Sequence, residues 1–275
     1  MTEKMQDQAY LKTKQYANPN NLNARITVHS YFSTGTESWN DFIYRYLKSQ
    51  PGLKMLALGC GNATQWRSNA LRFSSNVQIV LSDLSMGMLK EGRETFKEDA
   101  RYGFLCLDAQ LIPFDKDSFD RVTANHMLYH VPHIDRALQE ASRVLRTDGL
   151  FMAATNGEAH MHELYRLLRQ FEPNYQVEDE KHTRFSLENG TLQLEEFFKY
   201  VDVRIYNSDL WVTDAGLLVD YVYSMWDANE TISQARREEM CAYFQTLIER
   251  DGGIFIRKST GVFLASQNAE SLASV

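Results

Sequence analysis

Residues 54–63, KMLALGCGNA, decide the fold that we expect. The run MLAL is short and apolar, which is typical of a strand that is buried on both faces. It ends directly in Gly59, Cys60 and Gly61, and residues compatible with a helix follow. Glycines at such a point permit a tight turn and let a ligand approach the backbone closely. The stretch therefore predicts a strand, a glycine-lined turn that contacts a ligand, and a helix.

Strand and helix patterns alternate along the chain after this turn. Runs typical of strands lie at 54–58, 77–82, 103–107, 120–124 and 149–154. Helical patterns separate them, most clearly at 135–146, where the apolar residues share one face. This alternation predicts βαβ units, so the expected fold class is α/β, with a doubly wound, mostly parallel sheet and helices on both sides.

The segments outside this alternation have weaker patterns. Residues 1–35 are polar and aromatic by turns, and we expect an irregular or short-helical arm that folds over the site as a lid. Further helices are expected at 36–49, 159–171, 191–199, 214–226 and 234–250, and further strands at 200–206, 254–258 and 261–265, the last two as a pair. We therefore divide the chain into the arm, a domain at 36–267 with a helical insertion at about 213–251, and a disordered tail at 268–275.

The composition is that of an ordinary globular protein and argues against several classes. The 275 residues are 44% hydrophobic, and the net charge is −7. Such an acidic balance makes a nucleic-acid partner unlikely, because proteins that hold nucleic acid carry a basic surface. The N-terminal residues lack the apolar segment of a signal peptide, and no apolar run approaches the ~20 residues that cross a bilayer. The three cysteines, Cys60, Cys106 and Cys241, are too far apart to suggest a disulfide framework or a metal site. We expect a cytoplasmic protein with no membrane partner and no metal.

Side chains able to bind a nucleoside follow the next three strands, where open α/β sheets bind their ligands. Asp83 ends the second strand about 20 residues after the glycine turn, and a carboxylate there can hold both ribose hydroxyls. Asp108 ends the third strand and can accept from an exocyclic amine, while Asn125 and His126 end the fourth. Each acid could instead cap the following helix. Thr64 stands where a dinucleotide site needs a third glycine, so we expect a nucleoside ligand without a pyrophosphate.

Five motifs carry a resemblance to a known family. They are KMLALGCGNA at 54–63, LSDLSMGML at 81–89, CLDAQLIPFDKDSFDRV at 106–122, NHMLYHV at 125–131 and LQEASRVLRTDGLFMAAT at 138–155. Over about residues 50–160 the chain resembles the class I S-adenosylmethionine-dependent methyltransferases, in particular the small-molecule branch of the ubiquinone/menaquinone-biosynthesis type. The resemblance implies a Rossmann-like, seven-stranded sheet with an antiparallel last strand. It also implies S-adenosylmethionine as the cofactor and S-adenosylhomocysteine as the product.

The resemblance further implies a role for each residue at a matching position. The turn Gly59-Cys60-Gly61 would lie against the amino-acid part of the cofactor, and Asp83 would hold the ribose. The other cofactor-binding positions are Leu84 or Met88 on the adenine face, Asp108 and Ala109 at the adenine edge, and Asn125 at the methyl-donor end. Ala57 departs from the family pattern, which has an acid two residues before the first glycine, and Ala63 replaces the usual third glycine. We expect the loss of the acid to weaken cofactor binding and to leave the fold intact.

Candidates for the chemistry lie after the fourth strand and in the arm. Methyl transfer from a sulfonium is an in-line displacement, for which a protein mainly aligns the reactants and excludes water. A general base helps when the acceptor is a hydroxyl or a protonated amine. His126 and His130 are the candidate bases, and a structural role is the alternative for each. In the arm, Arg25 could pair with the carboxylate of the cofactor and Tyr16 could close over it, unless the arm only packs on the surface.

The sequence therefore predicts an enzyme that methylates an O, N or C atom of a small-molecule acceptor, whose identity it does not give. One alternative is a catalytically silent module that binds the cofactor or a partner, which Ala57 motivates. A tRNA-modifying methyltransferase is disfavoured by the acidic balance, and an NAD-dependent oxidoreductase by the missing third glycine. We expect a monomer or a homodimer.

Overall fold

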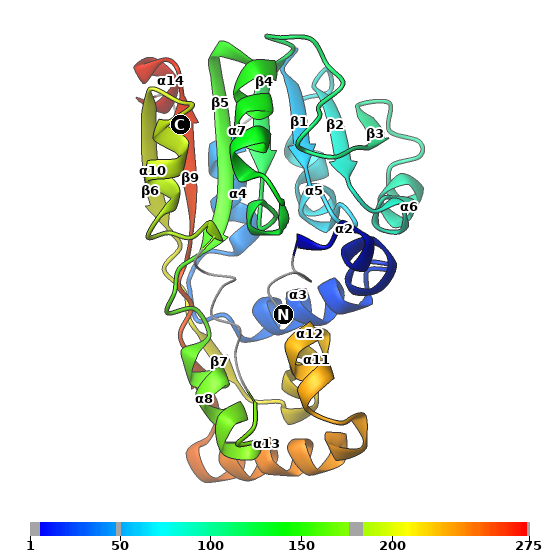
Figure 1. The fold of residues 1–275 in the computed structure, drawn as a ribbon, viewed down its shortest axis with the longest axis vertical. Helices are drawn as coiled ribbons and strands as arrows, with labels where there is room; N and C mark the ends of the chain where they lie inside the picture. Colours follow the sequence, from blue (N-terminus) through cyan, green and yellow to red (C-terminus); the bar gives the residue numbers. More distant parts are fainter. Residues whose placement is uncertain (1–5, 48–50, 176–183, 274–275) are drawn as a thin grey trace.

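Seven strands form the central sheet of the computed structural model, which describes residues 6–47, 51–175 and 184–273 (Figure 1). Their order is β3-β2-β1-β4-β5-β9-β6. The strands are β1 (Lys54–Leu58), β2 (Gln78–Asp83), β3 (Tyr102–Cys106), β4 (Phe119–Ala124), β5 (Leu145–Asn156), β6 (Tyr200–Ile205) and β9 (Thr260–Ser266). The pairs among β1 to β5 are parallel, whereas β9 runs antiparallel to both β5 and β6. The predicted Rossmann-like sheet with an antiparallel last strand is confirmed.

Helices cover both faces of this sheet because their apolar residues recur on one side. In α7 (Ile134–Val144), the buried residues lie three or four positions apart, and they pack with α10 (Gly190–Glu195) in a core on one face. On the other face, α4 (Trp39–Leu47) and α5 (Thr64–Asn69) share a core with the inward side chains of β1 and β2. α6 (Met86–Thr95) contacts β2 and β3. Two hydrophobic layers thus hold the sheet rigid.

A second lobe, which we call the cap, lies below the carboxyl ends of the parallel strands in the view of Figure 1. Its elements are α8 (His162–Phe171), β7 (Leu210–Val212), α11 (Ala215–Ser224), α12 (Trp226–Thr231), η4 (Gln234–Arg236), α13 (Arg237–Asp251) and β8 (Ile254–Ile256). These elements enclose a separate hydrophobic core. Figure 1 shows α3 (Asn20–Phe32) crossing between the cap and the sheet, beside the short α2 (Gln8–Tyr10) and η1 (Leu11–Gln15). The N-terminal segment therefore lies where the two lobes meet.

Two expectations about individual segments were wrong, and a third held in one of its two forms. The arm, expected to be irregular or short-helical, is helical, and α3 is a helix of 13 residues that packs on α11 and buries Val28 completely in the cap core. The last two strands do not pair with each other: β8 pairs with the unpredicted β7 in a separate two-stranded sheet, and β9 joins the main sheet. The tail is helical over α14 (Ala269–Ala273), where the hydroxyl of Ser271 donates to the Asp148 carbonyl at 2.8 Å.

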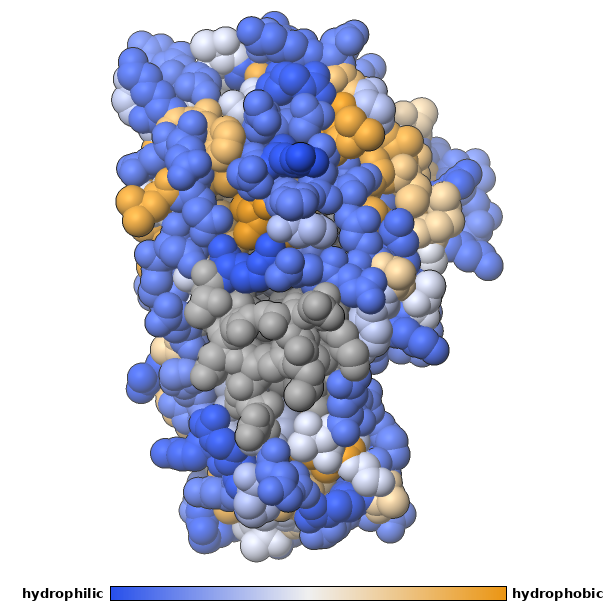
Figure 2. Space-filling model, in the orientation of Figure 1, coloured by the Kyte–Doolittle hydropathy of each residue, from blue (hydrophilic) through white to orange (hydrophobic). Residues whose placement is uncertain are grey.

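The surface carries no membrane-spanning element among the described residues, where every helix is too short or too polar to cross a bilayer. Figure 2 shows a face that is mostly hydrophilic, with hydrophobic residues in scattered groups. Hydrophobic groups of this size are normal on a protein surface.

Candidate functional site

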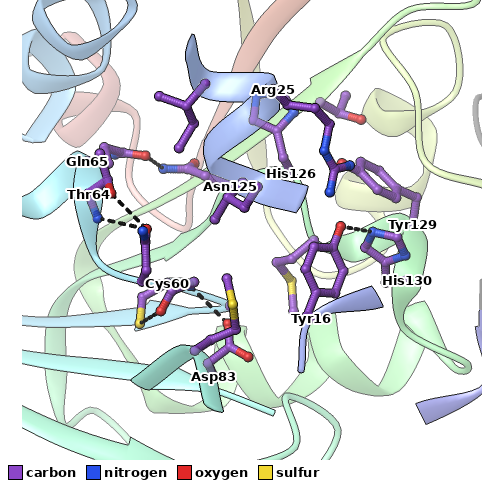
Figure 3. Close-up of a pocket in the computed structure, with 18 of the residues that line it drawn as sticks. Tyr16, Arg25, Cys60, Thr64, Gln65, Asp83, Asn125, His126, Tyr129 and His130 are labelled. Atoms are coloured by element: carbon purple, nitrogen blue, oxygen red, sulfur yellow. Dashed lines mark hydrogen bonds between the residues drawn. The ribbon is translucent and has the colours of Figure 1, made fainter. Parts of the chain in front are cut away.

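A cavity of about 660 Å³ lies where the carboxyl ends of β1, β2 and β4 face α3. The chain runs from β1 outward to β3 and then returns to β4 on the other side of β1, so the cavity sits at the point where the strand order reverses. Every residue predicted for the site lines this cavity: Tyr16, Arg25, Gly59, Cys60, Gly61, Asp83, Leu84, Met88, Asp108, Ala109, Asn125, His126 and His130. Figure 3 shows Asp83 and Cys60 on one side, and Arg25, Tyr129 and His130 on the other. The roles proposed for these residues remain predictions.

The glycine turn has the backbone that the sequence requires. Gly59 and Gly61 have φ values of +63° and +59°, which L side chains rarely adopt. A Cβ on Gly59 would also lie 2.7 Å from the Cβ of Met127. The N–H of Gly61 donates to Asp83 Oδ2 at 2.9 Å, and the N–H of Ser85 donates to Asp83 Oδ1 at 2.8 Å. Asp83 therefore fixes the turn, and each of its oxygens keeps lone-pair capacity for a ligand.

The two predicted carboxylates differ in their electrostatic setting. Burial raises the pKa of Asp83 and outweighs its hydrogen bonds from Ser85 and Gly61. Burial opposes the charge of Asp108 too, but hydrogen bonds from Gln110 and Gln8 outweigh it and lower the pKa of Asp108. Gln8 Nε2 donates to Asp108 Oδ2 at 2.7 Å, and the Gln110 N–H donates to Oδ1 at 2.9 Å. Asp108 thus already binds the arm as well as its own loop.

The arm is attached to the cavity rim at several points. Ser85 Oγ donates to the Tyr16 carbonyl at 2.8 Å, and Asn62 Nδ2 donates to Asn23 Oδ1 at 3.0 Å. Deeper in the molecule, Gln15 Nε2 donates to the Ser224 carbonyl of α11 at 3.2 Å. With the Gln8 contact, these bonds attach the arm to the rim of the cavity, and its role as a lid stays a prediction.

The residues that follow β4 divide into a structural amide and two imidazoles. Asn125 Oδ1 accepts from the Ala154 N–H and its Nδ2 donates to Gln65 Oε1, both at 3.2 Å, so its amide ties β4 to β5 and α5. His126 has a φ of +54°, an unusual backbone for a residue with a Cβ, and backbones of this kind cluster at functional sites. Burial, with a further contribution from Arg25, lowers the pKa of His126 to about 4, so this ring is neutral at pH 7.

His130 pairs with the arm. Its Nε2 lies 3.1 Å from the hydroxyl oxygen of Tyr16, and the two rings meet edge to face (Figure 3). The pair joins the turn after β4 to the arm, and both residues line the cavity. A phenol and an imidazole in hydrogen-bond contact can pass a proton between them.

Arg25 lies between these groups with part of its guanidinium unused. Its Nε donates to the Asn21 carbonyl at 3.1 Å, whereas Nη2 is buried and has no hydrogen-bond partner. Burial opposes the charge, but the hydroxyl of Tyr16 and those of Tyr221 and Tyr129 outweigh it and raise the pKa of Arg25. A buried donor without a partner is costly, so a ligand acceptor at this point would stabilise it.

Several lining residues carry chemistry that sequence reasoning did not select. Gln65 Nε2 is a second buried donor without a partner. Lys258, His29 and His160 come from three different segments and line the cap side of the cavity. No motif in the sequence signals that these three residues meet. Their roles depend on tertiary packing.

Comparisons with known proteins support the assignment that the geometry suggests. Residues 56–153 match the family model described as a methyltransferase domain. The chain is 34% identical over 123 residues to demethylmenaquinone methyltransferase of Clavibacter sepedonicus, an alignment that covers 44% of this chain and 49% of that protein. It is 30% identical over 151 residues to the mitochondrial 2-methoxy-6-polyprenyl-1,4-benzoquinol methylase of Danio rerio, and this alignment covers 42% of this chain and 46% of that protein. These similarities, which cover less than half of the chain, support the resemblance to the class I S-adenosylmethionine-dependent methyltransferases over the matched residues.

The methyltransferase fold extends beyond the matched motifs, although the chain spans only about half the length of these curated relatives. Phosphoethanolamine N-methyltransferase 2 of Haemonchus contortus matches with a TM-score of 0.60 at 20% identity, over 95% of this chain and 59% of that one. The [4+2]-cyclase SpnF matches with a TM-score of 0.58 at 16% identity, over 94% of this chain and 96% of that one. Since a protein named as a cyclase has the same fold as one named as a methyltransferase, the fold alone does not establish the reaction.

The residues of the cavity fit the cofactor of the methyltransferase family. Both glycines of the turn line the cavity, and since they have no side chains a ligand can lie against their backbone. Asp83 offers acceptors for ribose hydroxyls beside the apolar side chains of Leu84 and Met88. Gln65 Nε2 and Arg25 Nη2 are donors without partners, as a site for the carboxylate of an amino acid requires.

Proposed function

We propose that this chain transfers the methyl group of S-adenosylmethionine to an O, N or C atom of a small-molecule acceptor. The observation that supports this most directly is the meeting of all predicted site residues in one cavity of about 660 Å³. Both relatives are named for the methylation of small molecules, which argues against a silent module and against a tRNA-modifying enzyme. The cytoplasmic location and the monomeric or homodimeric state stay predictions.

The cofactor would supply an electrophilic methyl group on a sulfonium, and this chain would hold it along the carboxyl ends of the strands. Asp83 accepts from the ribose hydroxyls, and Leu84 and Met88 pack on the adenine. Asp108 and Ala109 lie at the adenine edge, where the adenine amine competes with Gln8 for the carboxylate. Gly59, Cys60 and Gly61 contact the amino-acid part, and Asn125 lines the methyl-donor end. Arg25 pairs with the carboxylate through the Nη2 that has no protein partner.

Two imidazoles are available to manage the proton of the acceptor. His126 is neutral at pH 7, but a pKa of about 4 makes it a weak base, so we assign it to holding the acceptor by a hydrogen bond. His130 is the better candidate for the base. The Tyr16 hydroxyl holds its ring in place, and a proton taken by Nε2 or by the phenol can be shared between them.

The arm would exclude water from the reacting atoms. Its bonds to Ser85, to Asp108 and to the Ser224 carbonyl place Tyr16 over the cavity. Water exclusion strengthens every electrostatic contact inside the site and favours in-line attack on a preformed electrophile.

Calorimetry with S-adenosylhomocysteine, with NAD as the control ligand, tests the cofactor assignment. We expect binding of the first and none of the second. Transfer of a labelled methyl group to a set of phenols, amines and enols then tests the reaction. His130→Gln should abolish most of the transfer and leave the affinity for S-adenosylhomocysteine unchanged. The proposal fails if S-adenosylhomocysteine does not bind at millimolar concentration.

A further inference from the structure

The cap side of the cavity is a separate subsite, remote from the glycine turn. α3 spans the distance between them: Leu22 lies against Gly61, and a Cβ on that glycine would be 3.0 Å from Leu22 Cδ2. His29 is seven residues further along the helix, which corresponds to roughly 10 Å at 1.5 Å per residue. His29 also lines the cavity, where its ring stacks on that of His160 and meets the ring of Tyr221 in α11 edge to face. A group bound next to His29 is therefore an acceptor group.

Lys258 is the charged residue of this subsite. It lies in the loop between β8 and β9, where its backbone N–H donates to Asp209 Oδ1 at 2.9 Å. Its Nζ donates to Ser33 Oγ at 2.8 Å and lies 5.0 Å from the centre of the Tyr206 ring. Within the described part of the chain, Lys258 forms no ion pair. An ammonium has three donors, so two are available to a ligand.

Burial makes the positive charge of Lys258 unfavourable. Burial lowers the pKa of Lys258 to about 8, which Asp209 only partly opposes. His29 is affected in turn, because burial and then Lys258 lower its pKa to about 3, so this ring stays neutral. Arg25 and His126 add to the same effect on His29 from the cofactor side.

The nearby carboxylates balance this charge only in part. Asp209 favours the charged form of Lys258 but forms no ion pair with its ammonium and accepts its backbone N–H instead, and Glu37 pairs with Arg45 at 2.6 Å. His160 accepts at Nδ1 from the Ser259 N–H at 3.3 Å and stacks on His29 with 6.1 Å between ring centres. A desolvated lysine without an ion pair at a cavity wall is costly, and an anionic ligand removes that cost.

We propose that Lys258, held in place by Ser33 and assisted by His29, binds a carboxylate or phosphate group on the methyl acceptor. The substrates of this enzyme are then acidic small molecules. This rests on the proposed function, because it identifies the cap side of the cavity as the acceptor pocket. The His29 ring can donate a second hydrogen bond to the anion while the ammonium supplies the charge.

Titration calorimetry with matched probes tests the proposal on the full-length chain saturated with S-adenosylhomocysteine. The probes are benzoate, phenyl phosphate and the neutral benzamide, all at pH 7. We expect at least one anion to bind at least about tenfold more tightly than benzamide, the scale of a charge-assisted bond. The preferred anion identifies the acidic group as a carboxylate or a phosphate.

Variants of Lys258 decide whether the anion binds at this wall. Lys258→Met keeps the length of the side chain and should remove the preference for the anion. Lys258→Arg should keep the preference, and Lys116→Met, at an exposed lysine, is the control for a general loss of charge. Circular dichroism checks folding, and Lys258→Gln replaces the methionine variant if that variant is unfolded.

Two results would overturn the proposal: equal binding of the anions and benzamide, or an anion preference that persists in Lys258→Met. Failure of the proposed function is distinct, because S-adenosylhomocysteine itself would then not bind to the unmodified protein. In that case the anion titrations are run without it, and the same comparison decides.

Discussion

Replacing Asp83 by alanine tests the centre of the site, because this one carboxylate organises the glycine turn and is also the predicted ribose ligand. Its oxygens accept from the backbone N–H groups of Gly61 at 2.9 Å and Ser85 at 2.8 Å. The variant removes both acceptors and leaves two backbone donors unsatisfied at the cavity wall. Stability and cofactor affinity should therefore both change, through separate contacts of the same side chain.

The magnitudes follow from these contacts. A hydrogen bond to a charged group contributes about 1.5–3 kcal/mol. Two effects reduce the sum for Asp83: burial raises its pKa, so desolvation of the carboxylate offsets part of the gain, and water in the cavity can rehydrate the freed donors. We expect the free energy of unfolding to fall by about 2 kcal/mol. Loss of the ribose contact should weaken binding of S-adenosylhomocysteine by roughly tenfold to a hundredfold.

Urea unfolding measures the free energy of unfolding, and calorimetry measures the affinity for S-adenosylhomocysteine. Asp83→Asn is the matched variant, because its amide oxygen can still accept one of the two backbone bonds. The stability of Asp83→Asn should lie between those of the unmodified protein and Asp83→Ala. Its affinity for S-adenosylhomocysteine should fall nearly as much as that of Asp83→Ala. A loss of stability with unchanged affinity in both variants would refute the ribose assignment and leave Asp83 as an anchor of the turn alone.

Three further predictions concern the lid and the cap side. Burial lowers the pKa of Lys258 to about 8. Between pH 8 and the pKa of a lysine in the unfolded chain, the unfolded state therefore binds more protons than the folded state, and the free energy of unfolding rises with pH. Denaturation at several pH values should show this rise, and Lys258→Met should lack it. Tyr16→Phe removes the hydroxyl that contacts His130, so kcat should fall more than the affinity for S-adenosylhomocysteine, and an unchanged kcat would exclude the pair from catalysis. Deletion of residues 1–19 should leave a folded protein with weaker cofactor binding. Deletion of residues 1–32 should also unfold the cap, because it removes α3 from the cap core, and limited proteolysis distinguishes the two outcomes.

The sequence predicts an element well where its burial is regular. The strand expected at 54–58 has those bounds in the structure, because four of its five residues are buried and the flanking glycines end it. The bounds of α3 were not predicted because much of its inward face borders a cavity, and Val28 is its one fully buried residue in the cap core. Leu22, Arg25, Ile26 and His29 line that cavity, so no apolar stripe marks the helix. β7 was missed because three residues are too few for a periodic pattern.

Which site residues can be predicted from the sequence also depends on their place in the fold. Residues that directly follow a strand could be predicted, since parallel strands bring their carboxyl ends to one edge. Asp83, Asp108 and His126 are of this kind. Lys258 could not be predicted, because it lies in a loop between two strands of different sheets and reaches the cavity only through the docking of the cap. Gln65 follows the glycine turn by one helical turn, and only its missing partner reveals that it is available to a ligand.

The family pattern has an acid at the position of Ala57, and the contacts of the glycine turn indicate what its absence changes. Ala57 is buried in β1, and its carbonyl accepts from Ser82 Oγ at 2.7 Å. The N–H groups of the turn are held from β2: that of Cys60 by the Ser82 carbonyl at 2.8 Å, and that of Gly61 by the Asp83 carboxylate. Because β2 shapes the turn, an acid at position 57 is not needed for its geometry in this chain. What its absence removes is a negative charge near the amino-acid part of the cofactor. Fold and affinity are therefore separable here, which is why we expect weaker binding of the cofactor in an intact site.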